Sequence, residues 1–211
     1  MDSLIDVIEE LPGYDHALKV VQMNSDGPIY LVGNVVSCTL ANVIHGEPQI
    51  ITRPFSFLLE RRAPQFGVPR DWTQTRNEGL LKLAERFEPF MRETICRSEE
   101  KYLRFKTRKG YEVNMILLSD HHYIIAQGKP ATIANFFEHA PLTIDCIALE
   151  IHDSGNAKTR KLWGQTGVNA ILERTCSINN FSSAHYQSAL RNMSLQDYAK
   201  GRAEHIKFQL T

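Results

Sequence analysis

The sequence has no excess of either charge, because its 24 lysine and arginine residues balance 24 aspartate and glutamate residues. Proteins that coat nucleic acid or bind membranes through basic segments carry a large cationic excess, so this balance argues against both classes. It leaves room for a local basic surface. The other proportions, 43% hydrophobic and 23% charged among 211 residues, are ordinary for a globular chain that forms a core without disulfides or metals.

Cysteine is scarce, and its spacing argues against the common cysteine sites. The four cysteines, Cys38, Cys96, Cys146 and Cys176, form no C-x-x-C pair. Neither a zinc ribbon nor a thioredoxin-type redox site is therefore supported. Isolated cysteines in such a chain usually pack as small apolar side chains, so we expect buried thiols.

The sequence also lacks a leader pattern and a long apolar run. Residues 1–6 mix acidic and apolar side chains and carry no basic segment, unlike a secretory signal. No uncharged apolar stretch approaches the ~20 residues that a membrane span needs. These absences predict a cytoplasmic location and no membrane partner. The motifs G-x-S-x-G and H-E-x-x-H and the P-loop are absent as well, so hydrolase, zinc protease and NTP-driven motor functions have no support.

Apolar spacing and turn residues predict the elements of the first half of the chain. Pro12 interrupts the first helical pattern, and Gly46 is a suitable C-terminal stop for the second. The expected elements are two helical pieces within 4–18, a strand over 29–33, a helix over 35–44, a strand over 55–59 and a long helix over 80–95.

The second half begins with a hairpin signal, because alternation before and after Lys109-Gly110 is typical of two paired strands. The expected elements are strands over 102–108, 111–118 and 120–125, a helix over 132–140, a helix or strand over 142–149, and helices over 162–174 and 183–202. We expect one mixed α+β domain over residues 1–153 and a small helical C-terminal region over 154–211.

Four segments, taken in chain order, form a recognisable series. They are IYLVGNVV at 29–36, GEP at 46–48, YEVNMIL at 111–117, and the run from ANFF at 134–137 to LTIDCIAL at 142–149. In this order they resemble the catalytic head of the template-independent nucleotidyltransferases, the polymerase-beta-like group of bacterial poly(A) polymerases and CCA-adding enzymes. The resemblance covers roughly residues 28–151. It implies a nucleotidyltransferase-like mixed sheet flanked by helices, followed here by a short helical tail.

The chemistry of that family needs two divalent cations, which align the 3′-hydroxyl with the triphosphate and offset charge during the displacement. Two carboxylates one residue apart on a strand, and a third on a neighbouring strand, hold the cations. The resemblance places Pro54 and Ser56 at the first two positions and Asn114 at the third. It also places Gly33 and Asn34 at the nucleotide-binding turn. Neutral side chains bind Mg²⁺ far more weakly than carboxylates, so we expect no catalytic metal site.

The leading hypothesis is therefore a degenerate nucleotidyltransferase-fold protein, of a kind that phage genomes carry, that binds RNA, a nucleotide or a protein partner without a cofactor. Ser56, Asp71 and Asn114 are the candidate catalytic positions, and Asp71 recovers one acid in a later alignment of the metal strand. A rival hypothesis is an active Mg²⁺-dependent transferase with a rearranged site around Asp71, Asp120 or Asp145. A third is a protein-interaction or inhibitor module, which predicts an exposed apolar patch.

One stripe of side chains suggests nucleic-acid binding. Tyr102, Arg104, Lys106 and Arg108 share one face of an expected strand, where the cations suit phosphates and the tyrosine suits base stacking. A solvated strand face is the competing interpretation. The motif Asp120-His121-His122 suggests a metal, but adjacent strand residues point to opposite faces, so a structural role for the histidines is favoured.

Overall fold

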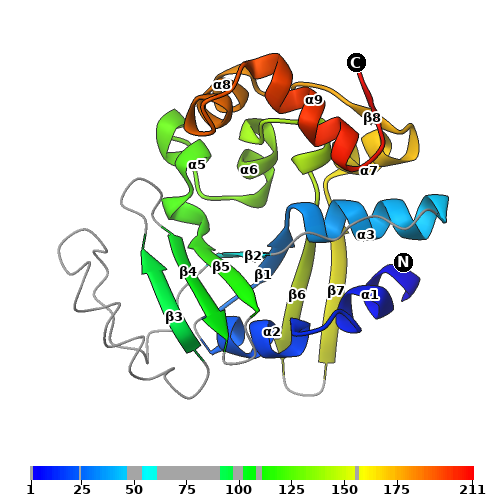
Figure 1. The fold of residues 1–211 in the computed structure, drawn as a ribbon. Coiled ribbons are helices and arrows are strands. Elements are labelled where there is room, and N and C mark those ends of the chain that lie inside the picture. Colours follow the sequence, from blue (N-terminus) through cyan, green and yellow to red (C-terminus); the bar gives the residue numbers. More distant parts are fainter. Residues whose placement is uncertain are drawn as a thin grey trace.

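The computed structural model describes residues 2–23, 25–46, 54–60, 91–96, 102–107, 111–154 and 157–211. Its centre is a sheet of seven strands: β1 (Ile29–Val32), β2 (Phe55–Leu59), β3 (Met91–Cys96), β4 (Tyr102–Thr107), β5 (Glu112–Leu117), β6 (Ala148–Ser154) and β7 (Ala157–Trp163). The order across the sheet is β3-β4-β5-β2-β1-β6-β7 (Figure 1). The β2–β5 pair is parallel and the other pairs are antiparallel. A mixed sheet flanked by helices confirms the expected fold class.

Helices cover the sheet and form the C-terminal region. They are α1 (Asp2–Glu9), α2 (Tyr14–Gln22), α3 (Asn34–His45), α5 (His122–Gln127), α6 (Ile133–His139), α7 (Gln165–Leu172), α8 (Phe181–Leu190) and α9 (Leu195–His205), with 3-10 turns η2 (Leu118–Asp120) and η3 (Thr143–Asp145). Two short parallel strands, β8 (Thr175–Cys176) and β9 (Gln209–Leu210), tie the tail together. Among the described helices, none has the length and apolarity needed to cross a membrane.

Strand β1 lies between β2 and β6 and is buried at all four positions. An apolar run without alternation suits a strand that is covered on both faces. Ile29 and Leu31 contribute to the larger core under α1, α2, α3 and α7. Tyr30 and Val32 point into a smaller core on the other face, under α5 and α6. The site described below lies on this second face.

Glycines delimit α3, and Gly46 ends it as the sequence predicts. Gly33 precedes the helix with φ 79° and ψ −156°, a backbone conformation that only glycine adopts readily. Gly46 ends it in the left-handed conformation, with φ 67°. Helix α1 packs against α3, and the Arg160 guanidinium of β7 donates to Glu9 of α1 over 3.1 Å. The N-terminal helix is thereby tied to the far edge of the sheet.

Several predicted elements are confirmed: the two N-terminal helices, the strands at 29–33 and 55–59, the hairpin of β4 and β5, and the helix at 132–140. The long helix over 80–95 is wrong at its end, because residues 91–96 form strand β3 and pair with β4. Residues 61–90 lie outside the described part. Helical apolar spacing does not exclude a strand that finds a partner in the sheet.

Two other predictions differ from the structure. Residues 120–125 are not a strand, since η2 and α5 occupy them and the His121 side chain caps α5. Residues 142–149 divide between η3 and the start of β6.

The helix predicted over 162–174 is confirmed over Gln165–Leu172, where α7 lies, but its first two residues belong to β7, which pairs with β6 along its whole length. The helix predicted over 183–202 is found as two helices, α8 and α9. The division into two domains at residue 153 stays a prediction.

Candidate functional site

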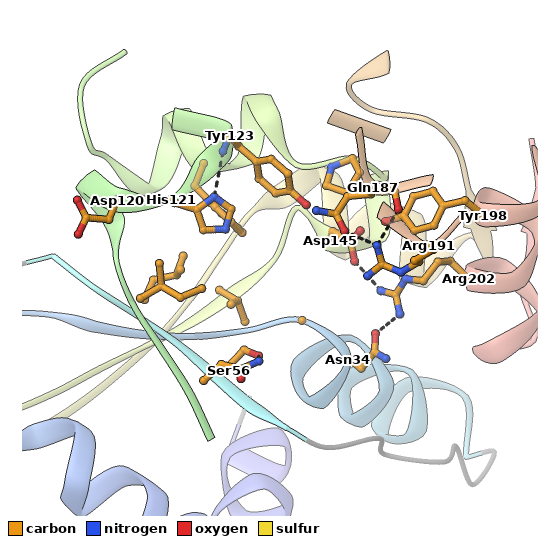
Figure 2. Close-up of a pocket in the computed structure, with 17 residues that line it drawn as sticks. Asn34, Ser56, Asp120, His121, Tyr123, Asp145, Gln187, Arg191, Tyr198 and Arg202 are labelled. Carbon is orange, nitrogen blue, oxygen red and sulfur yellow. Dashed lines mark hydrogen bonds and ion pairs between the residues drawn. The ribbon is translucent and has the colours of Figure 1, made fainter. Parts of the chain in front are cut away.

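A cavity of about 370 Å³ lies between the sheet face under α5 and α6 and the C-terminal helices α8 and α9 (Figure 2). Its walls come from segments far apart in the chain, from β1 near residue 32 to α9 near residue 202. Ligand sites in proteins commonly have volumes of about 300–1,000 Å³, so this cavity suits one small molecule. We call it the interhelical pocket.

The floor of the interhelical pocket is built by strand alternation. Val32, Ser56 and Asn114 stand in one row across β1, β2 and β5, because Val32 pairs with Ser56 and Ser56 pairs with Asn114. The Asn114 Nδ2 donates to Ser56 Oγ over 3.2 Å. The Asn114 Oδ1 is buried and has no hydrogen-bond partner among the described residues. The floor is therefore polar but uncharged.

One wall holds a largely buried ion pair that joins three elements. The Nη2 atom of Arg202 on α9 lies 2.6 Å from Asp145 Oδ1 of η3, and the two side chains are 20% and 16% exposed. Arg202 also donates through Nη1 to Asn34 Oδ1 at the start of α3. Burial by itself would lower the pKa of Arg202, but the Asp145 carboxylate, with Tyr198 and Cys38, more than offsets it and holds that pKa above its usual value. Arg202 is thus a fixed cation.

A second cation stands next to this pair. Arg191, at the end of α8, donates through Nη1 to the carbonyl oxygen of Gln187 over 2.9 Å and to the Gln187 side chain. Its guanidinium lies over the ring of Tyr198, 5.3 Å from the centroid. Figure 2 shows Gln187, Arg191 and Tyr198 on the same side of the pocket as Arg202. Arg191 is exposed, and no acidic side chain in the described part of the chain forms an ion pair with it.

The opposite wall is aromatic. The His121 ring centroid lies 4.5 Å from that of Tyr123 and 5.0 Å from that of Phe136. The Nδ1 of His121 accepts the Tyr123 backbone N–H over 3.4 Å, which caps α5. The expected structural role for His121 follows from helix capping rather than from the strand geometry on which the prediction rested. The described residues contain no group of three histidine, cysteine or acidic side chains that could hold a metal ion.

The interhelical pocket brings together six of the residues named from the sequence: Gly33, Asn34, Ser56 and Asn114, and the rival candidates Asp120 and Asp145. A Cβ built on Gly33 would meet no atom within 4 Å, so the backbone there is open to the pocket. Asp71 lies outside the described residues, and so does Arg108.

The predicted basic stripe lies on the strand next to the floor. Backbone pairing sets Arg104 of β4 opposite Asn114 of β5. The side chains of Tyr102, Arg104 and Lys106 lie outside the described part. Their nucleic-acid role therefore stays a prediction.

Sequence reasoning missed the residues of the C-terminal wall, which are Gln187, Arg191, Tyr198 and Arg202. The sequence predicts one helix over 183–202 and gives it no binding role. One usable signal was present, because Gln187 and Arg191 are four residues apart and so share a helix face. Arg202 had no such signal, since its partners Asn34 and Asp145 are remote in sequence.

The donor set does not fit the two cations that the nucleotidyltransferase chemistry requires. Ser56 and Asn114 offer one hydroxyl and one amide at the floor. Figure 2 shows Asp120 and Asp145 on opposite sides of the pocket, and Asp145 is already paired with Arg202. Hard divalent cations prefer several converging carboxylates, which the described residues do not supply.

Comparison with known proteins gives a structural likeness only. No family model matches the sequence, and no curated protein matches it. Solved structures do match. A CCA-adding enzyme in its apo form II is 13% identical with a TM-score of 0.59, and the match covers 100% of this chain and 44% of that one. The Thermotoga maritima CCA-adding enzyme complexed with tRNA is 13% identical with a TM-score of 0.57, covering 99% of this chain and 42% of that one, and a CCA-adding enzyme with ATP is 12% identical with a TM-score of 0.55, covering 100% and 41%. The chain spans about two fifths of the length of these proteins. The likeness shows that it has their nucleotidyltransferase-like fold.

Proposed function

We propose that the protein binds a nucleotide in the interhelical pocket and does not transfer it. The observation that carries this proposal is the hydrogen bond between Asn114 and Ser56 on the floor. Two uncharged side chains, bonded to each other, stand on the paired strands where the family resemblance implies metal-binding carboxylates. A protein that keeps this fold but lacks these acids keeps the pocket for a nucleotide and loses the metal ligands that nucleotidyl transfer needs.

The other walls support nucleotide binding. Arg191 and Arg202 supply two cations on one side, and guanidinium groups bind phosphate through paired N–H donors. Helix α3 begins at the pocket with Gly33, and helix N-termini carry a partial positive charge. Solved structures with this fold include CCA-adding enzymes in complex with CTP and with ATP. These features together favour a nucleotide over an uncharged metabolite.

RNA is a natural extension of this proposal. The predicted basic stripe lies on β4, and β4 is hydrogen-bonded to β5, which carries Asn114. An RNA whose terminal nucleotide occupies the pocket would pass close to this strand. One solved structure of the same fold holds tRNA, but more than half of its chain has no counterpart here, so we propose a nucleotide as the minimal ligand.

Catalysis without a metal has little support in this geometry. Phosphoryl transfer depends on cations that position the phosphates and offset their charge. Among the described residues, the acids nearest the floor are Asp120 and Asp145, which lie on opposite sides of the pocket. The rival active site around Asp71 stays a prediction, because Asp71 lies outside the described residues. The protein-partner hypothesis stays a prediction as well.

Calorimetric titration with ATP and CTP, combined with a transfer assay on RNA acceptors in Mg²⁺, tests the proposal. We expect saturable binding and no extension of the RNA. Arg191→Ala should weaken binding by about tenfold, since hydrogen bonds to charged groups contribute about 1.5–3 kcal/mol. Lys200→Ala is the matched control, because Lys200 is an exposed cation on α9 that pairs with Glu204 and does not line the pocket. Robust transfer that disappears in Asp71→Asn would support the rival instead.

A further inference from the structure

We infer that His139, at the end of α6, and Asn180, at the start of α8, form a pH-sensitive latch that holds the α8 wall of the interhelical pocket in place. The latch is closed while the His139 Nδ1 carries no proton, and it opens when the ring takes up a second proton. This inference goes beyond the proposed function and does not depend on it, because the latch acts on α8 with or without a ligand. The hydrogen bonds of Asn180 and the burial of His139 carry it.

Two side-chain amides close the C-terminal end of α6. The last carbonyl groups of a helix have no partner within the helix itself. The Asn179 Nδ2 donates to the carbonyl oxygens of Phe137 and Ala140, each over 2.8 Å. The Asn180 Nδ2 donates to the carbonyl oxygen of Glu138 over 3.2 Å. The turn that precedes α8 is thereby fastened to α6.

The contacts of Asn180 determine which way its amide points. Its Oδ1 accepts the Ser183 backbone N–H over 3.0 Å and caps α8. Its Nδ2 has two N–H groups, of which one is directed to Glu138 and the other to His139 Nδ1, 3.3 Å away. An amide nitrogen only donates, so this hydrogen bond requires an unprotonated Nδ1.

A proton on His139 Nδ1 turns this hydrogen bond into a contact between two donors. The ring cannot leave the contact for water, because His139 is only 5% exposed. A buried charge without a hydrogen-bond acceptor is costly, and moving Asn180 away admits water to the ring. An imidazole takes up its proton between about pH 5 and 8, so we expect the latch to open on mild acidification.

The other ionisable groups near His139 do not replace Asn180. The elements around the ring carry Glu138 on α6, Asp145 and Cys146 at η3, and His185 and Arg191 on α8. Glu138 is exposed and pairs with Lys129 over 2.6 Å, and Asp145 is paired with Arg202. Among the described residues, Asn180 is the one hydrogen-bond partner of the ring. The negative end of α6 favours a cation at His139, so the Asn180 contact is the one that gives way.

The latch acts on the pocket through α8. This helix packs mainly against α9, and the turn at Asn179 and Asn180 fastens its first residues to α6. Gln187 and Arg191 line the pocket from α8, beginning about two turns beyond Asn180. Loosening the start of α8 therefore loosens the wall that carries the exposed cation of the pocket.

Hydrogen–deuterium exchange of the whole chain, measured without ligand at about pH 7.5 and about pH 5.5, tests the latch. Dividing by the intrinsic exchange rates gives protection factors for the backbone amides of α8, with those of α3 as the internal reference. In the natural sequence we expect the protection of α8 to fall about tenfold at the lower pH, the effect of about one hydrogen bond. The protection of α3 should change less than about twofold.

Two substitutions separate protonation from a general loss of packing. His139→Asn keeps an acceptor for Asn180 and has no proton to gain, so the protection of α8 should no longer depend on pH. Asn180→Asp still caps α8, because a carboxylate is a good N-cap, but it offers the ring an acceptor. Its pH dependence should invert, with α8 better protected at the lower pH. The matched control His185→Asn removes an exposed ring on the same helix and should keep the tenfold fall.

Melting curves establish that the variants are folded. The inference is overturned if the protection of α8 in the natural sequence is the same at both pH values, if it falls as far in His139→Asn, or if Asn180→Asp follows the natural sequence. A fall that His139→Asn removes and Asn180→Asp inverts supports the latch. Calorimetry with ATP judges the proposed function separately: no binding, with the pH effect intact, overturns the proposed function and leaves the latch.

Discussion

Asn114 and Ser56 face each other on the parallel strands β5 and β2, and the asparagine amide donates to the serine hydroxyl over 3.2 Å. Each occupies a position where a carboxylate would reach a shared cation. Replacing both by aspartate, in Ser56→Asp with Asn114→Asp, should create a site that depends on Mg²⁺. Two like charges at this distance repel each other, so the double variant should be less stable in EDTA and regain stability when Mg²⁺ is added.

Thermal unfolding with and without Mg²⁺ measures this effect. We expect a rise of several degrees in the melting temperature of the double variant in Mg²⁺ and no change for the natural sequence. The control is Ser182→Asp with Asn169→Asp, which adds two carboxylates at exposed positions on different helices. If this control responds to Mg²⁺ as strongly, the effect is not specific to the floor.

The ion pair of Arg202 and Asp145 should stabilise the fold as well as shape the pocket. Arg202→Met removes the cation and leaves the 16% exposed Asp145 carboxylate without its partner, so we expect a loss of about 3 kcal/mol in the free energy of unfolding. Combining it with Asp145→Asn removes the unpaired charge and should recover most of this loss. Urea unfolding of the two variants gives both values. If the double variant is no more stable than Arg202→Met, the unpaired Asp145 charge is not the cause of the lost stability.

The backbone at Gly33 should tolerate no other residue without cost. Gly33→Ala leaves the side chain in open space, because no atom lies within 4 Å of the added Cβ. The φ of 79° and ψ of −156° are nevertheless strained for alanine, so we expect a loss of about 2 kcal/mol. Gly201→Ala on α9 is the matched control: it also meets nothing within 4 Å, and in a helix it should gain about 0.5 kcal/mol. Chemical denaturation measures both changes in the free energy of unfolding, the loss in Gly33→Ala and the gain in Gly201→Ala.

Burial makes the thiols a source of pH-dependent stability. Burial first, and the Asp145 carboxylate second, raise the pKa of Cys146 to about 12 and that of Cys176 to about 12. A pKa that is raised in the folded state gives stability that is complete below the pKa of the unfolded thiol, near 9, and is lost as the pH rises toward 12. We expect the free energy of unfolding to fall between pH 8.5 and 10.

The control for this prediction is Cys146→Ala with Cys176→Ala, whose unfolding free energy should depend less steeply on pH over the same range. Titration stays below pH 10 because burial also raises the pKa of Tyr30 and of Tyr198. Ionisation of those two tyrosines lowers the free energy of unfolding further at higher pH. An equal slope in the double variant and the natural chain would contradict the assignment to the thiols.

Local signals were enough to predict much of the floor. Gly33 and Gly46 delimit a helix by their own backbone preferences, and a buried strand such as β1 is recognisable from four consecutive apolar residues. Strand alternation and the family resemblance together led to Ser56 and Asn114, and the structure sets them side by side. The glycine stop and the buried strand depend on few neighbouring residues, whereas the pairing of Ser56 with Asn114 needed the family resemblance, because these residues are 58 positions apart.

The C-terminal wall could not be predicted, because it depends on contacts between remote segments. Arg202 gains its role from Asn34 and Asp145, and nothing in the helix around it distinguishes it from an exposed arginine. Strand β7 was missed for a related reason. Its charged residues look solvated in sequence, yet Arg160 is buried against Glu9, and Trp163 donates to Glu150 of β6 over 2.5 Å.

The hydrogen bond from Arg202 to Asn34 joins residues that are 168 positions apart. A ribosome adds about 5–20 residues per second, so the two sides of the pocket are made roughly 8–34 seconds apart. Helices of this kind form in microseconds, and sheet domains often fold within seconds. Gly33 and α3 therefore emerge well before the helix α9 that completes the wall of the pocket. The pocket that we propose as a nucleotide site stays incomplete until α9 has been synthesised.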